Sequence, residues 1–133
     1  LDYFKVAGAL LGVIAQRLLR GMCPHCKEPT VPNQRMLDTL LEGQDMVIPP
    51  DAVFYKGAGC GKCMGSGYSG RIPIYEIFII SPAIQKAIEA GLPHSKLREL
   101  ALKEGMVELA PAGIRQALQG RTTVEEVYYK LSS

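Results

Sequence analysis

Several signatures of common enzyme classes are missing from this 133-residue sequence. It contains no GxxxxGKS or GxxxxGKT phosphate-binding loop, no serine, histidine and aspartate set, and no paired carboxylates in a plausible cleft. Internal repeats and low-complexity tracts are also missing. Because backbone amides of a phosphate-binding loop are what cradle a nucleotide, the chain is expected to hydrolyse no ATP on its own.

Charge and hydropathy exclude two further kinds of partner. Fifteen basic and thirteen acidic residues leave a formal charge of +2, with no run of five like charges, which argues against nucleic acid as a partner. The longest apolar stretches, near residues 6–15 and 72–80, are far shorter than the ~20 residues that cross a bilayer, so no direct membrane insertion is expected. The chain starts with Leu1 inside a helix-like pattern, which suggests a piece of a longer protein.

Cysteine is scarce, but its placement is regular. All four cysteines lie in two CxxC pairs: the first knuckle, residues 23–26 (CPHC), and the second knuckle, residues 60–63 (CGKC). Two thiolates at positions i and i+3 around a tight turn can bind one tetrahedral metal from the same side, and a second pair completes the shell. The spacing therefore predicts a structural zinc site formed by Cys23, Cys26, Cys60 and Cys63.

Other uses of these residues were weighed. Two disulfides or two redox CxxC pairs have the same spacing, but four cysteines in 133 residues are sparse for a disulfide scaffold and no signal peptide precedes them. His25 lies between two ligands of one knuckle, where its side chain should point outward into solvent. We therefore interpret His25 as a turn residue and not as a fifth ligand.

Hydrophobic spacing predicts the elements of the first half. Residues 3–11 carry enough apolar groups for a buried helix, whereas residues 13–20 suit either a helix or a buried strand. Residues 27–32 contain two prolines and are predicted as loop. Asn33 is expected to cap a short helix that ends near Gly43, and residues 53–56 are expected to form a short strand.

The second half is predicted to contain one strand and four helices. Residues 71–80 (RIPIYEIFII) give the strongest strand signal, with Pro73 indicating its entrance or an edge. Helices are expected to start at Ser81-Pro82, Ser95, Pro111 and the capping box that begins at Thr123, and to form a compact bundle. Glu76, amid apolar residues, suits a buried base or, more commonly, a paired structural carboxylate.

A series of short motifs then follows in a fixed order along the chain. They are GVIAQRL at residues 12–18, CPHC at 23–26, CGKC at 60–63, GYSGR at 67–71, IYE at 74–76, EGM at 104–106 and GRTTVEEV at 120–127. In this order they resemble the C-terminal part of the ATPases of type II secretion and type IV pilus assembly. The resemblance covers essentially the whole chain, and the ordered series is far more specific than one CxxC pair.

This resemblance implies an α+β fragment. It would contain a helix and an antiparallel strand pair from a RecA-like ATPase core, a tetracysteine zinc-binding insertion and a C-terminal bundle of short helices. Residues 1–22 would end the ATPase core, residues 23–69 would form the insertion, residues 70–80 would return as a core strand, and residues 81–133 would form the helical part. The resemblance also favours a strand over a helix at residues 13–20.

The resemblance further implies a hexameric motor at the cytoplasmic face of a bacterial inner membrane. Such a motor uses ATP and Mg²⁺ to drive pilus or pseudopilus assembly, and its phosphate-binding loop would precede Leu1. Its expected partners are neighbouring ATPase subunits and inner-membrane platform proteins. Arg71, in the GYSGR motif, matches a position that contacts nucleotide in the family, and Tyr68 lies nearby. The alternative for Arg71 is a surface arginine paired with a carboxylate.

Two other functions compete with this interpretation. One is a stand-alone zinc-ribbon interaction module, and the other is a rubredoxin-like iron protein, because four thiolates also hold iron. Within the motor, zinc is expected to preorganise a docking surface for a platform protein. The apolar face of the helix within residues 36–41 is a candidate contact, unless that face is buried against its own lobe.

Overall fold

A computed structural model describes residues 2–6 and 9–132 of the chain. The chain divides into two compact units, Leu1–Gln16 with Tyr75–Glu108 and Arg17–Ile74 with Leu109–Ser133. Each unit therefore combines segments from distant parts of the sequence. In chain order the elements are β1 (Asp2–Val6), β2 (Ala9–Met22), β3 (Lys27–Thr30), α1 (Gln34–Leu41), β4 (Phe54–Gly57), the 3₁₀ turn η1 (Gly61–Cys63), β5 (Tyr68–Ile79), α2 (Pro82–Glu89), α3 (His94–Lys103), α4 (Leu109–Leu118) and α5 (Val124–Ser132).

The helix predicted at residues 3–11 is wrong. Strand β1 occupies this part of the chain and pairs antiparallel with the start of β2, with Tyr3 opposite Val13 and Val6 opposite Ala9. A dense apolar run does not by itself distinguish a buried helix from a buried strand. Here the pairing with β2 provides backbone partners that hydrophobic density cannot reveal, and tertiary context overrides local propensity.

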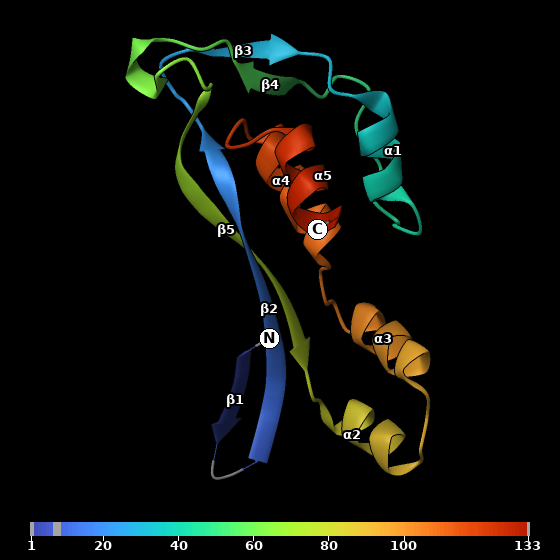
Figure 1. The fold of residues 1–133 in the computed structure, drawn as a ribbon. Coiled ribbons are helices and arrows are strands. Elements are labelled where there is room, and N and C mark those ends of the chain that lie inside the picture. Colours follow the sequence, from blue (N-terminus) through green and yellow to red (C-terminus); the bar gives the residue numbers. More distant parts are fainter. Residues whose placement is uncertain (1, 7–8, 133) are drawn as a thin grey trace. The chain divides into compact units, whose positions relative to one another are not determined.

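The two longer strands confirm the strand predictions at residues 13–20 and 71–80. They belong to one three-stranded sheet with the order β1-β2-β5, and β2 and β5 run in opposite directions (Figure 1). Pro73 lies exposed well inside β5, not at its entrance. Since β5 is the last strand in the sheet order, the edge interpretation of Pro73 is the correct one.

A second, two-stranded sheet lies between the two knuckles. Strand β3 pairs antiparallel with β4, with Lys27 opposite Gly57 and Thr30 opposite Phe54. The loop predicted at residues 27–32 is therefore wrong for its first four residues. Pro29 fits there because each strand of a two-stranded sheet has a free edge, where a missing N–H breaks no ladder. The strand predicted at residues 53–56 is confirmed with a shift of one residue.

Helix α1 closes the insertion against the C-terminal helices. The Asn33 side chain accepts a hydrogen bond from the Met36 N–H at 3.1 Å, as expected for a cap. Leu37 and Leu40 are buried, and they join a core that reaches β2, β4, β5, α4 and α5. The apolar face of α1 is thus buried within its own unit, which removes it as a docking contact. The core residues are Leu19, Leu37, Leu40, Phe54, Ile74, Ile114, Ala117, Val124 and Val127.

The predicted bundle of four C-terminal helices is divided between the two units, with two helices in each. Helices α2 and α3 contact each other within the first unit, whereas α4 and α5 pack together and against α1 within the second. Ser81 caps α2 as predicted, since its hydroxyl accepts the Ile84 N–H at 3.2 Å. Within the described part of the chain, no helix has the length and apolar character needed to cross a membrane.

Candidate metal centre

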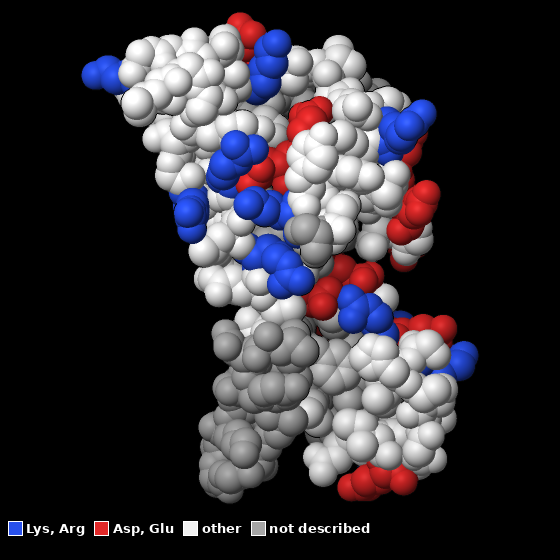
Figure 2. Space-filling view, viewed as in Figure 1, with Lys and Arg blue, Asp and Glu red and all other residues white. Residues whose placement is uncertain are grey.

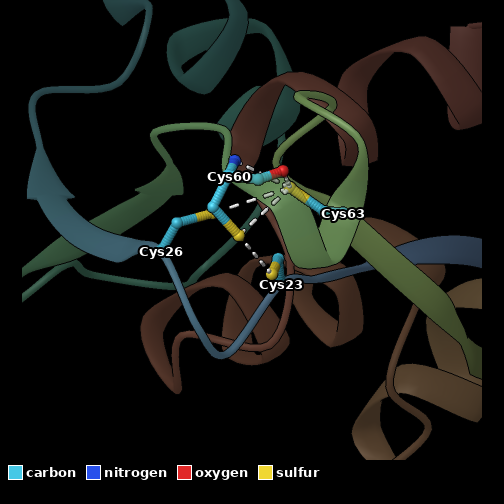
Figure 3. Close-up of side chains that lie close together, drawn as sticks. All are labelled: Cys23, Cys26, Cys60 and Cys63. Carbon is cyan, nitrogen blue, oxygen red and sulfur yellow. Dashed lines mark hydrogen bonds between the residues drawn. The ribbon is translucent and has the colours of Figure 1, made fainter.

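The fold brings all four cysteines together although they come from two distant segments. Cys23 follows the last residue of β2, and Cys26 precedes β3. Cys60 directly precedes the short 3₁₀ turn η1, and Cys63 is its last residue. Their sulfur atoms all lie within 4.8 Å of one another. The four side chains converge on one point (Figure 3). The sequence-predicted ligand set is therefore assembled in one place, where it can hold a metal ion.

The sulfur spacing fits a tetrahedral metal and not a disulfide. The Sγ atoms of Cys23 and Cys60, of Cys26 and Cys63, and of Cys60 and Cys63 are each 3.8 Å apart. A tetrahedral zinc with Zn–S bonds of about 2.3 Å requires sulfur atoms about 3.8 Å apart. A disulfide needs about 2.05 Å, and all four cysteines are free.

Backbone N–H groups point at the sulfur atoms. Gly59 donates to Cys26 Sγ at 3.3 Å, while Cys60 and Gly67 donate to Cys63 Sγ at 3.3 Å and 3.2 Å. Such donors favour a thiolate over a thiol. The Cys60 N–H, and then that of Gly67, lower the pKa of Cys63 to about 6, whereas desolvation raises the pKa of Cys26 to about 12. A divalent cation at the centre of the four sulfurs would favour the thiolate form of each cysteine.

The residues around the site indicate that the four sulfur atoms alone would coordinate the metal. Cys23 and Cys63 are buried, and Cys26 and Cys60 are partly buried. His25 is exposed, as predicted for a turn residue. The second knuckle turns through Met64 and Gly65, both with positive φ, which lets the Gly65 N–H bond the Cys60 carbonyl at 2.9 Å. Four thiolates fill a tetrahedral shell, so the arrangement suits a structural metal and not a catalytic one.

Comparison with known protein families shows to which family this chain belongs. The sequence profile of the type II/IV secretion system proteins matches residues 1–129. The chain belongs to this family. The family match confirms the resemblance that the ordered motifs indicated.

The relatives of this secretion-family chain are named as ATPases of type IV pilus assembly or of type II secretion. It is 41% identical over 93% of its length to the type IV pilus assembly ATPase PilB of Thermus thermophilus, covering 14% of that protein. It is 36% identical over 93% of its length to the pilus assembly ATPase TfpB of Acinetobacter baylyi, covering 21% of it. It is 34% identical over 96% of its length to the type II secretion system ATPase E of Vibrio cholerae, covering 24% of it. The chain thus spans no more than a quarter of these relatives.

The two predicted nucleotide-binding residues of this family member have different surroundings. Arg71 on β5 is exposed, and its side chain forms no hydrogen bond or ion pair with any residue that the structure describes. Tyr68 is partly buried, with its hydroxyl 2.8 Å from Thr123 Oγ1 and its ring 4.0 Å beneath the Arg20 guanidinium. The paired-carboxylate alternative for Arg71 is therefore not observed among the described residues. Nucleotide binding by Arg71 and by Tyr68 stays a prediction.

Glu76 is a paired carboxylate, as the commoner interpretation held. Its Oε1 lies 2.7 Å from Arg98 Nη2, and the same guanidinium is 2.7 Å from Glu108 Oε2. Desolvation by burial lowers the pKa of Arg98, but the hydrogen bond to Glu108 and the negative charge of Glu76 outweigh it. The net effect is a raised pKa of Arg98. This cluster joins β5, α3 and the segment before α4 within one unit.

Sequence reasoning missed one cluster beside the metal centre. Glu126 on α5 is almost fully buried and pairs with Arg20 on β2, with 3.0 Å between Oε1 and Nη2. On the face shown in Figure 2, several basic side chains lie close together, and acidic atoms lie beside some of them. The signal available in the sequence was the capping box beginning at Thr123, but its glutamate was expected to serve its own helix.

Proposed function

We propose that this chain is the C-terminal metal-binding and helical portion of a hexameric ATPase that powers pilus or pseudopilus assembly. The supporting observation is the family match over residues 1–129 combined with four sulfur atoms spaced for a tetrahedral ion. Relatives from both pilus and type II secretion systems match over nearly the whole chain. The RecA-like core would then end at residue 22 and return at residues 70–80, with residues 23–69 as the insertion.

The metal in this proposal is zinc with a structural role. Cys23, Cys26, Cys60 and Cys63 would hold it, and the ion supplies a cross-link between the two knuckles. Zinc binding energies of about 10 to 16 kcal/mol in small peptides show that such a cross-link can dominate the stability of its segment. An iron-thiolate centre would absorb visible light, whereas zinc would be colourless, so absorbance separates the two metals.

Nucleotide chemistry in this proposal belongs mainly to the part of the protein outside this chain. ATP and Mg²⁺ would bind at a phosphate-binding loop that precedes Leu1, and the chain alone would be inactive. Arg71 would contribute from β5 by contacting the nucleotide, which its exposure and free guanidinium permit. Tyr68 would support this region, although its hydroxyl and ring already contact Thr123 and Arg20.

The proposed location and partners follow from the machines to which the relatives belong. The motor would work at the cytoplasmic face of the bacterial inner membrane, next to identical subunits and platform proteins. The metal would hold residues 23–69 in one conformation, and a preorganised segment loses less entropy when it docks on a partner. Because α1 buries its apolar face, any docking surface of this insertion must lie elsewhere on it.

Replacing Cys60 and Cys63 with serine in the complete protein tests this function. ATPase activity, folding and pilus assembly or secretion are compared with the wild type and with the His25→Ala variant, whose exposed side chain is no ligand. Retained folding and ATPase with lost assembly would support a docking role. A wholly unfolded motor would reduce the site to a structural cross-link, and unchanged assembly would end the docking proposal.

A further inference from the structure

Among the residues that the structure describes, no strand pairs with one side of β2 next to the first knuckle. Strand β1 pairs with β2 only as far as Ile14. Further along, the Thr122 hydroxyl donates to the Arg20 carbonyl at 2.8 Å, and the Met22 N–H donates to the Arg121 carbonyl at 2.8 Å. The segment before α5 thus takes the place of a strand along the last residues of β2, directly before the first metal-binding cysteine.

Glu126 completes this contact with a buried charge. Its Oε2 accepts the backbone N–H of Arg20 at 2.8 Å, and its Oε1 accepts Arg20 Nε–H at 3.0 Å. Only half of the capping box forms: the Glu126 N–H bonds Thr123 Oγ1 at 3.0 Å, but the carboxylate turns to β2 instead of its own helix. With 1% exposure, a carboxylate that lost these donors would be left buried and unpaired, which is strongly unfavourable.

The same helix start also contacts the segment that follows the second knuckle. Thr123 at the start of α5 bonds the Tyr68 hydroxyl, and the Arg20 guanidinium lies over the Tyr68 ring. Tyr68 follows Gly67, whose N–H donates to Cys63 Sγ at 3.2 Å. The N-terminal turn of α5 therefore contacts both segments that carry the sulfur ligands, one through Arg20 and the other through Tyr68.

We propose that Glu126 is a positioning residue for the metal centre, and that metal binding and the folding of α5 are coupled through it. The inference rests on the proposed metal site. Outer-shell groups that orient ligands influence metal affinity, and here the oriented element is the end of β2 that carries Cys23. Coupling of this kind is reciprocal, so the bound metal stabilises α5 as much as α5 stabilises the metal site.

The Glu126→Gln variant of the complete protein tests whether Glu126 stabilises the metal site. Both carboxylate oxygens accept from Arg20, so glutamine places an N–H donor where one of these acceptors was. Transfer of the bound metal to a colorimetric chelator should become about ten- to a hundredfold faster. Glu125→Gln is the matched control because Glu125 lies in the same turn but accepts the exposed Asn33 N–H, and its rate should stay within about twofold.

Hydrogen exchange of the wild-type protein tests the other direction and needs no variant. Removing the metal with a chelator should reduce protection of the α5 amides, while the amides of α2 and α3 in the other unit serve as the internal reference. Retained protection of α5, or an equal loss in all three helices, would overturn the coupling. Equal release rates in the two glutamine variants would do the same.

The outcomes also separate this inference from the function on which it rests. A purified protein that contains no metal overturns the metal centre itself, and the positioning role with it. A full complement of metal that leaves at the same rate from the Glu126→Gln and Glu125→Gln variants overturns only the positioning role. Faster release from Glu126→Gln alone, together with selective loss of α5 protection, supports both.

Discussion

Cys23 and Cys60 bring their sulfur atoms to within 3.8 Å although 37 positions separate them in the chain. The distance equals the edge of a tetrahedron of thiolates around zinc, and it is too long for a bond between sulfurs. Two sheets meet at this point, since Cys23 follows β2 and Cys60 follows β4. Ligand loss should therefore loosen the connection between both sheets.

Replacing the ligand Cys26 should reduce the metal content, whereas replacing its neighbour His25 should not. Cys26→Ser is expected to reduce the metal content of the complete protein to less than half an equivalent, because three thiolates leave the shell open. His25→Ala should retain one equivalent, since His25 is exposed and is no ligand. Elemental analysis of both variants checks this. Equal metal content in the two proteins, or oxidised cysteine pairs in the wild type, would contradict a tetracysteine site.

An added methyl group should lower the stability of the second unit at Gly67 but not at Gly61. Gly67 has φ +81°, and a Cβ there would lie 2.5 Å from the Gly57 carbonyl oxygen. Gly67→Ala should destabilise the second unit by at least about 1–2 kcal/mol from the left-handed backbone alone. Gly61→Ala should change stability by less than about 0.5 kcal/mol, because its Cβ would meet open space. Hydrogen exchange of the β3 and β4 amides measures both; similar exchange would refute this.

Arg98 should contribute more to stability than Lys96, which lies on the same helix, α3. It holds Glu76 and Glu108, whose side chains are only 17% and 20% exposed. Arg98→Ala leaves two carboxylates partly buried without a donor, which should cost about 1–3 kcal/mol in the unit formed with residues 75–108. Lys96→Ala removes an exposed pair with Glu99 and should cost less than about 1 kcal/mol. The exchange rates of the α3 amides compare the two, and equal rates would argue against the cluster.

The nucleotide role of Arg71 predicts a kinetic effect without a metal effect. Arg71→Ala in the complete protein should weaken ATP binding or turnover, because a free guanidinium on β5 is removed. Metal content should stay at the wild-type level. Arg35→Ala on α1 is the control, since Arg35 is also an exposed arginine. If both variants hydrolyse ATP like the wild type, Arg71 is an ordinary surface residue.

Local signals in the sequence predicted much of this structure. The CxxC spacing predicted the ligand cluster, the Asn33 and Ser81 caps predicted where α1 and α2 begin, and β-branched residues predicted β5. For the two caps and for β5, a short segment carries the whole physical cause. Only the cysteine cluster required two distant segments to meet, and the matching CxxC spacing of both segments indicated that pairing.

The features that failed depend on long-range partners. Strand β1 forms because β2 is beside it, and the four C-terminal helices separate into two units because α4 and α5 pack on α1. Glu126 belongs to a recognisable capping box, yet its carboxylate serves Arg20, 106 positions away. Hydrophobic periodicity reports which face of an element is buried, but not against which element it packs.

Zinc K-edge X-ray absorption of the complete protein tests the central claim most directly, because it reports the ligands of the ion. We predict a shell of four sulfur atoms at about 2.3 Å with no nitrogen or oxygen neighbour. This result would assign all four cysteines to one closed structural site. A shell containing nitrogen or oxygen, or a protein that holds no zinc, would contradict the account.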